Sequence, residues 1–151
     1  MMERTSFSAG TMPRFSLKKP RARWPYLAVA CLLFVTAACD REPYPQGKNL
    51  YAVHCANCHM ADGTGLGGNI PPLAGADYLR DRQEMIACLI RHGSMDTVTV
   101  NGTVYDAPMP GVPRLSEFQI ANIINYVNHA WGNDYGFVTV EPIRRRLENC
   151  K

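Results

Sequence analysis

The 151-residue sequence lacks several features that would indicate common classes of protein. It has no internal repeat and no low-complexity tract, and its length suits one domain. Its longest apolar run, from Pro25 to Cys39, has 15 residues, fewer than the roughly 20 that a membrane-spanning helix needs. Apart from the pairs at residues 54–59, it has no close pair of cysteines or histidines, although a four-ligand zinc site usually requires a second one.

Residues 1–38 have the pattern of an export signal. Basic residues up to Arg23 precede the apolar run, which ends in the small residues Thr36, Ala37 and Ala38. A basic segment, a short apolar segment and small residues before a cleavage site are typical of exported proteins. We therefore exclude these residues from the expected fold, with Met12 as an alternative start.

The small residues directly before Cys39 resemble the lipobox of bacterial lipoproteins. This resemblance implies cleavage before Cys39 and acylation of its sulfur. Thr36 departs from the aliphatic residue usual at that position, so an uncleaved N-terminal membrane anchor is the alternative. Either arrangement tethers the folded part to the periplasmic face of the cytoplasmic membrane.

Removal of the export segment reverses the net charge. Of 16 basic and 13 acidic residues, six and one lie in residues 1–38, which leaves 10 basic and 12 acidic residues. The formal charge therefore changes from +3 to −2, and nothing favours a nucleic-acid partner. We interpret the run Arg144-Arg145-Arg146 as a solvated helix face.

Four of the six cysteines lie beyond the export segment and Cys39. Cys55 and Cys58 lie close together, whereas Cys88 lies in an apolar, helix-like run and Cys150 is the penultimate residue. Because disulfides persist outside the cytoplasm, we expect Cys88 and Cys150 to form one that holds the C-terminal extension, residues 134–151. Two free buried thiols are the alternative.

The apolar periodicity predicts three or four helices after a short polar tether at residues 39–46. These helices are expected at residues 47–57, 76–92, 116–131 and 141–149. Ser116 and Gln119 form a capping box at the start of the third helix, and Gly93 is a stop for the second. Residues 98–105 alternate around Asn101-Gly102, which predicts a β-hairpin.

Residues 61–75 contain too many glycines and prolines for regular structure. We expect this loop to be ordered by something other than its own backbone bonds. The predicted elements also leave a modest core for about 110 residues. A large bound group in the middle of the domain would explain both features.

The stretch His54-Cys55-Ala56-Asn57-Cys58-His59 is compatible with three kinds of site. Zinc would need further ligands. A thioredoxin-type redox pair would need its first cysteine at a helix N-terminus, whereas this motif follows a predicted helix. Cys-x-x-Cys-His is the attachment pattern of a c-type haem, in which Cys55 and Cys58 form thioethers and His59 binds the iron.

A ligand for the opposite face of the iron has to come from elsewhere in the chain. The candidates are Met60, Met85, Met95, Met109, His54, His92 and His129. Met60 is adjacent to His59 and cannot reach the opposite face, and most of the others lie in predicted helices. We expect Met109, because Pro108 and Pro110 stiffen the loop that carries its sulfur, and we keep Met95 as the alternative.

These motifs resemble those of class I monohaem cytochromes c, in particular small membrane-tethered bacterial domains. The resemblance extends over residues 47–133, which we assign as the cytochrome domain. It rests on Gly47-x-x-x-Tyr51, Cys55-Ala-Asn-Cys58-His59, Pro71-Pro72-Leu73-Ala-Gly75, the hairpin, Tyr105-x-x-Pro-Met109-Pro110 and the helix from Leu115 to Val127.

The resemblance implies an all-α cytochrome c fold, with three to four helices and a small hairpin around one covalently bound haem c. It implies that the helix containing Gly47 crosses the one containing Tyr126, that Tyr51 stacks on Tyr126, and that the Pro71 carbonyl accepts the Nδ1 proton of His59. Leu73 would pack on the haem edge.

The expected function is single-electron transfer between membrane respiratory partners, since a His/Met iron has no vacant site for a substrate. No carboxylate pair or second nucleophile suggests other chemistry, and no small-molecule substrate is expected. The alternatives are a relay haem in a dehydrogenase or oxidase complex and, less favoured, a haem gas sensor or peroxidase.

Overall fold

A computed structural model describes residues 42–150. The predicted export signal and Cys39 lie outside the described residues, as does Lys151. The helices are α2 (Pro45–His54), α3 (Ala56–His59), α4 (Asp77–Asp81), α5 (Gln83–His92), α6 (Glu117–His129) and α7 (Val140–Leu147). The strands are β1 (Gly93–Ser94), β2 (Val98–Val100), β3 (Thr103–Tyr105) and β4 (Met109–Pro110). No helix in this part of the chain is long and apolar enough to cross a membrane.

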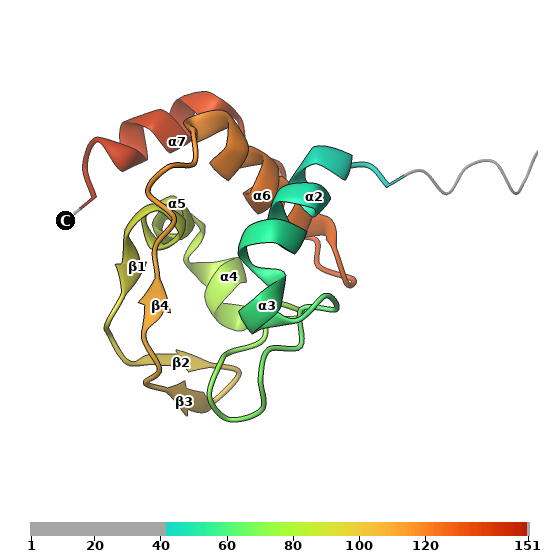
Figure 1. Ribbon diagram of the computed structural model, residues 1–151, viewed down its shortest axis with the longest axis vertical. Coiled ribbons are helices and arrows are strands. Elements are labelled where there is room, and N and C mark those ends of the chain that lie inside the picture. Colours follow the sequence, from blue (N-terminus) through green and yellow to red (C-terminus); the bar gives the residue numbers. More distant parts are fainter. Residues whose placement is uncertain (1–41, 151) are drawn as a thin grey trace, which may run out of the picture. The chain divides into compact units, whose positions relative to one another are not determined.

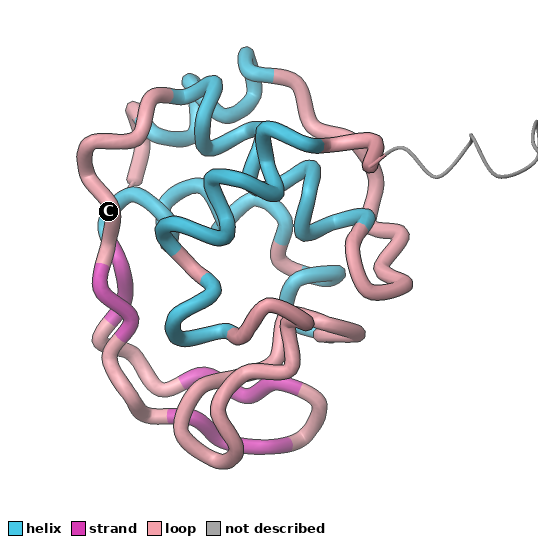
Figure 2. The backbone as a smooth tube through the Cα atoms, turned by 45° about the vertical axis from the view of Figure 1, so that its right-hand side comes forward, coloured by secondary structure: helices cyan, strands magenta, loops and turns pink. Residues whose placement is uncertain are grey.

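The helices gather in one half of the domain, and the strands and long loops form the other half (Figures 1 and 2). Helix α6 lies at the centre of the core, where Ile120, Ile123 and Ile124 are at most 2% exposed. Its start has the predicted capping box: Gln119 N–H donates to the Ser116 hydroxyl, and the Gln119 side chain accepts from Ser116 N–H. The core therefore forms around the most strongly patterned segment of the sequence.

Helices α2 and α6 cross at Gly47, as expected (Figure 1). A Cβ atom at Gly47 would lie 2.1 Å from the carbonyl oxygen of Asn122 and 2.7 Å from Cβ of Tyr126. Helix α2 begins at Pro45, inside the segment that we expected to be a tether. Proline suits the first turn of a helix because its fixed φ is already helical and its missing N–H would have no partner there.

Two of the predicted helices are each divided in two, so the expected number of three to four helices is too low. The break between α2 and α3 falls at Cys55 (φ −124°, ψ −36°), and that between α4 and α5 falls at Arg82 (φ −129°, ψ 36°). At the second break the Gln83 side chain donates to the Leu79 carbonyl oxygen at 2.7 Å. This side-chain bond takes the place of a backbone bond at the interruption. Apolar periodicity alone does not reveal such an interruption.

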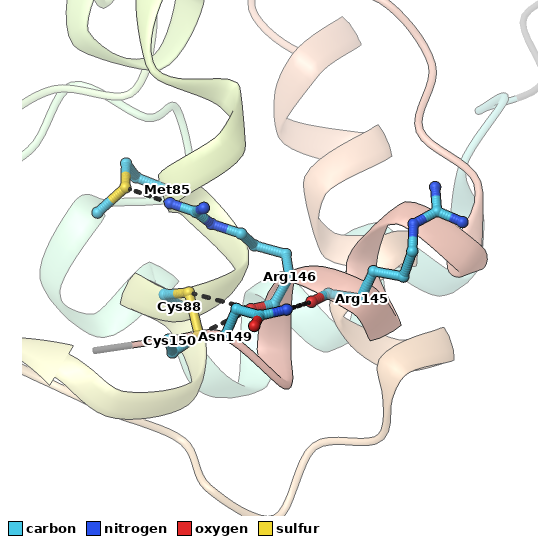
Figure 3. Close-up of a disulfide and its surroundings, with 6 residues drawn as sticks. All are labelled: Met85, Cys88, Arg145, Arg146, Asn149 and Cys150. Atoms are coloured by element: carbon cyan, nitrogen blue, oxygen red, sulfur yellow. Dashed lines mark hydrogen bonds between the residues drawn. A yellow bond between two sulfur atoms is a disulfide. The ribbon is translucent and has the colours of Figure 1, made fainter.

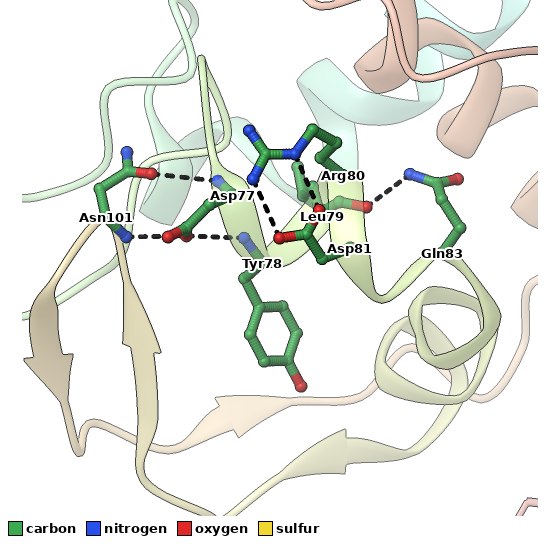
Figure 4. A network of polar contacts seen from close by, with 7 residues as sticks. All are labelled: Asp77, Tyr78, Leu79, Arg80, Asp81, Gln83 and Asn101. Carbon is green, nitrogen blue, oxygen red and sulfur yellow. Dashed lines mark hydrogen bonds and ion pairs between the residues drawn. The ribbon is translucent and has the colours of Figure 1, made fainter.

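The predicted hairpin is present as β2 and β3, with Asn101 (φ 50°) and Gly102 (φ 77°) at its turn. It is attached to α4 by a pair of bonds (Figure 4). Asn101 N–H donates to the Asp77 carboxylate at 2.8 Å, and Asp77 N–H donates to the Asn101 side-chain oxygen at 3.0 Å. A second strand pair, β1 with β4, was not predicted and aligns Ser94 with Met109.

The loop at residues 61–75 corrects one expectation, because it is held partly by its own backbone. Leu73 N–H and Ala74 N–H both donate to the Gly63 carbonyl oxygen, at 2.7 and 3.0 Å. Leu66 and Ile70 form an isolated antiparallel bridge. The glycines and prolines that exclude helix and strand still allow a closed loop whose two ends are bonded to each other.

The C-terminal extension packs across the helices, with α7 against both α5 and α6. The structure contains the expected disulfide between Cys88 on α5 and Cys150 (Figure 3). Arg146 corrects the interpretation of the arginine run: its side chain is half-buried and donates to the Met85 sulfur at 2.8 Å. Arg144 and Arg145 are exposed and pair with Glu141.

Candidate functional site

A cavity lies between the helical half and the strand half of the domain. The space outside protein atoms measures about 1160 Å³, part of it open to solvent. Apolar side chains from α4, α5 and α6 form much of its wall: Leu79, Ile86, Leu89, Ile90, Ile123, Ile124 and Val127. A large apolar group would fill the space that these stripes leave open.

Cys55 and Cys58 both line this cavity. Cys55 ends α2 and begins α3, and its carbonyl oxygen accepts from Cys58 N–H at 3.1 Å and from His59 N–H at 2.9 Å. This single turn places side chains three residues apart on the same side of the helix. Both thiols are free and partly exposed, and both residues lie on the lining of the cavity.

Burial raises the pKa of the Cys55 thiol to about 11, and the neighbouring Cys58 adds to the effect. A redox pair of the thioredoxin type needs the opposite shift, because the thiolate is its nucleophile. The environment of Cys55 therefore disfavours the redox alternative and keeps this sulfur as a protonated thiol.

His59 is 8% exposed and lies on the cavity wall. Its Nδ1 is 3.1 Å from the Pro71 carbonyl oxygen, the arrangement implied by the resemblance. Burial lowers the pKa of His59, while the bond to Pro71 acts in the opposite direction. Because a carbonyl oxygen can only accept, Nδ1 carries the proton, which leaves the lone pair on Nε2 for a metal ion.

Met109 is the one candidate for the second axial position that lines the cavity. Its strand partner is Ser94, so β1 and β4 hold it at the cavity wall. Met95, the alternative, is 80% exposed. The other candidates lie elsewhere: His54 and His92 are exposed, Met60 follows α3, Met85 contacts Arg146, and His129 bonds to the Asn125 carbonyl oxygen.

Pro71 and Leu73 also line the cavity, so the structure brings all six predicted cofactor-binding residues to one site. Tyr51 contacts Tyr126 at 5.4 Å between ring centroids, but the rings are tilted by 51° rather than stacked. A third ring, Trp131, lies edge-on to both, at 5.1 Å from Tyr51 and 5.5 Å from Tyr126. The Tyr51 hydroxyl donates to the Met60 carbonyl oxygen at 2.6 Å, and burial raises its pKa.

Sequence reasoning missed two kinds of residue at this site. The apolar stripes of α5 and α6 were assigned to the core, although Ile90 and Ile124 also face the cavity. One observation could have revealed them: the predicted helices carry more apolar residues than the modest expected core needs. Trp131 and Asn133, which contact the loop at residues 61–75, gave no signal because their partners are about 60 to 70 residues away.

The residues present fit a covalently attached porphyrin. Two thiols, a histidine whose Nδ1 is already bonded, and a methionine surround one apolar cavity. Thioether sulfur and imidazole nitrogen are the axial ligands of c-type cytochromes. The fold and the site therefore define a monohaem protein that binds haem c.

Comparison with known proteins agrees with this class. Residues 45–131, more than half of the chain, match the family model described as cytochrome c. The chain belongs to the cytochrome c family, so it carries a covalently bound haem c and functions in haem-based electron transfer. This membership confirms the predicted fold class and selects haem attachment from the three alternatives for the motif.

Among its relatives is a cytochrome c-552 of Thermus thermophilus, 33% identical over 91 residues, which cover 58% of this chain and 69% of that protein. The cytochrome c subunit of a quinone alcohol dehydrogenase from Gluconobacter oxydans is 33% identical over 102 residues, which cover 66% of this chain and 21% of the subunit. The cytochrome c subunit of a gluconate 2-dehydrogenase from Pantoea cypripedii is 30% identical over 90 residues, 58% of this chain and 20% of that subunit. The match therefore spans about a fifth of each dehydrogenase subunit.

Proposed function

We propose that Cys55 and Cys58 hold the haem by thioethers, that His59 and Met109 are its axial ligands, and that the protein moves single electrons between respiratory partners at a membrane. The observation that carries this proposal is the position of Met109. Of seven candidate residues, it alone lines the cavity that His59 also lines. Pro71 and Leu73 complete the contacts to the cofactor.

When bound, a haem c supplies an iron that changes its charge by one electron. The role of the protein is to keep the geometry of this iron nearly constant. Pro71 fixes the orientation of His59, and the pairing of β1 with β4 fixes the backbone of Met109. His59 and Met109 would hold the iron from the protein and leave no position for a substrate, and the Met109 sulfur would favour the reduced state.

The apolar wall supports the same role. Leu79, Ile90 and Ile124 exclude water from the cavity, and charge in a medium of low polarity is less stable than in water. The wall therefore raises the reduction potential, in the same direction as the methionine ligand. Asp96 lies on the cavity lining and is exposed, so the site keeps one accessible side toward solvent and a docked partner.

The membrane location rests on the sequence before the described residues. The export pattern and the lipobox-like sequence support acylation of Cys39 on the periplasmic face. Only Asp40 and Arg41 separate Cys39 from the first described residue, Glu42. Three peptide units reach about 10 Å at most, so a lipid at Cys39 would keep the domain close to the membrane surface.

A relay haem in a dehydrogenase complex is the second candidate. The relatives named as cytochrome c subunits of alcohol and gluconate dehydrogenases favour it. A carrier and a relay need the same cavity and the same axial ligands. Copurification from native membranes in a mild detergent separates them: a relay remains with a dehydrogenase or oxidase, whereas a carrier elutes alone.

Replacement of Met109 tests the proposed ligand set. In Met109→Ala we expect a lower reduction potential than in wild type, and a ferrous spectrum that changes on addition of carbon monoxide. Met95→Ala is the matched control, because Met95 lies in the neighbouring loop with 80% exposure and does not line the cavity. If Met109→Ala kept the wild-type reduction potential and its ferrous spectrum did not change on addition of carbon monoxide, the assignment of Met109 would be wrong.

A further inference from the structure

The turn that follows α6 has an unusual backbone. Trp131 (φ 55°) and Gly132 (φ 83°) both lie in the left-handed region, and Trp131 is a bulky residue that rarely adopts it. Asn133 N–H donates to the Ala130 carbonyl oxygen at 2.9 Å, which closes the turn. The result is that Asn133 is 7% exposed and its side chain lies against the end of α6.

The Asn133 amide forms hydrogen bonds with three partners, which use both of its N–H donors. Its Nδ2 donates to the Val127 carbonyl oxygen at 2.8 Å, which satisfies one of the free carbonyl groups at the end of α6. The same nitrogen donates to the Leu73 carbonyl oxygen at 3.0 Å, and its Oδ1 accepts from Gly75 N–H at 2.8 Å. One side chain therefore joins the central helix to the end of the cavity loop at residues 61–75.

Trp131 holds the other end of this loop. Its indole nitrogen donates to the Ala61 carbonyl oxygen at 3.1 Å, and its ring lies against Gly63, where a Cβ atom would come within 2.5 Å. Gly63 in turn accepts from Leu73 N–H and Ala74 N–H. The two ends of the loop are thus bonded to each other and to one short turn.

Pro71 lies inside this loop, two residues before Leu73. We propose that Asn133 is a positioning residue for His59: by fixing Leu73 and Gly75 against α6, it keeps the Pro71 carbonyl oxygen aligned with the imidazole Nδ1–H. This inference rests on the proposed role of His59 as an iron ligand. A partner on Nδ1 sets the orientation of a metal-bound imidazole and makes it a stronger donor.

The chain offers a closely matched control in Asn125. This residue belongs to α6 and is 4% exposed. Its amide makes two bonds, both to Val138 in the C-terminal extension, at 2.9 and 2.8 Å. Loss of either asparagine amide should destabilise the fold, but only Asn133 is connected to the loop that carries Pro71.

The test compares Asn133→Ala with Asn125→Ala in the haem-loaded protein. The readout is the hydrogen-exchange rate of the His59 Nδ1–H, followed by NMR in the diamagnetic ferrous state. We expect this proton to exchange about tenfold faster in Asn133→Ala than in Asn125→Ala. A factor of about ten is what the loss of one hydrogen bond typically produces in an equilibrium. The reduction potential should rise in Asn133→Ala only, because a weaker imidazole donor stabilises the oxidised iron less.

Equal exchange rates and equal potentials in the two variants would overturn the proposal, because they would show that Asn133 acts only on global stability. If Asn133→Ala does not retain haem, Asn133→Ser supplies the same comparison with a smaller loss of hydrogen bonding. Failure of the underlying ligand assignment looks different. In that case the wild-type protein itself would lack the strong upfield shift that the porphyrin ring current gives to the ring protons of a bound histidine.

Discussion

Gly47 of α2 lies directly against the backbone of Asn122 of α6, with room for a hydrogen atom and not for a methyl group. The crossing packs α2 on α6, and Tyr51 and Cys55, at the end of α2, both line the cavity. A single missing side chain therefore determines how the attachment motif meets the central helix.

Replacement of Gly47 by alanine should separate the two helices. The new methyl group would lie 2.1 Å from a carbonyl oxygen, so we expect a loss of about 1–3 kcal/mol in the free energy of unfolding. Denaturant unfolding followed by haem absorbance measures this loss. Gly67→Ala is the control, since no atom lies within 4 Å of its added methyl group, and an unchanged Gly47→Ala protein would contradict the observed helix crossing.

Removal of the disulfide should destabilise the protein by constraining the unfolded chain less. Cys88 and Cys150 are 62 residues apart, so the chain-entropy relation gives a contribution of about 4 kcal/mol. The double variant Cys88→Ser/Cys150→Ser should unfold at correspondingly lower denaturant concentration. Wild-type protein treated with a reductant should approach the same midpoint, and coinciding oxidised and reduced midpoints would show that the bond adds no stability.

Covalent attachment can be tested by extraction with acidified acetone. We expect the pigment of the wild-type protein to stay with the precipitated chain, since thioether bonds survive acid. In Cys55→Ala/Cys58→Ala, any haem held by His59 and Met109 alone should appear in the solvent. Release of the pigment from wild type would show that these two sulfurs do not form the links.

The role of Cys39 is tested by membrane fractionation of Cys39→Ala. Loss of the acylation site should abolish lipid incorporation, measured with a labelled fatty acid. Retention of the variant in salt-washed membranes would support the alternative of an uncleaved N-terminal anchor. A wild-type protein found only in the soluble periplasmic fraction would contradict both forms of tether.

Sequence patterns predicted those parts of the fold that depend on interactions between residues close together in the chain. The capping box at Ser116 and Gln119 and the turn at Asn101-Gly102 each depend on residues within three or four positions. The splits at Cys55 and Arg82 were not predictable in this way. Each interrupts a segment that the sequence pattern predicted as a single helix.

The candidate site shows the same division. The attachment motif and the flanking prolines of Met109 pointed, from short-range spacing, to residues that the structure places around one cavity. The second strand pair that holds Met109 was missed, because Ser94 and Met109 carry no pattern that marks them as partners. The three bonds of Asn133 were missed for the same reason, since its loop partners lie about 60 residues away.

The sequence by itself determined which groups can attach a cofactor: Cys55, Cys58 and His59 lie within five positions, and this spacing, together with the export pattern and the prolines around Met109, predicted the attachment of a haem. Tertiary structure decided which methionine faces the cavity and which residues hold the loop at residues 61–75 in place. These relations depend on contacts between segments far apart in the chain, and such contacts exist only after α2, α5 and α6 have packed.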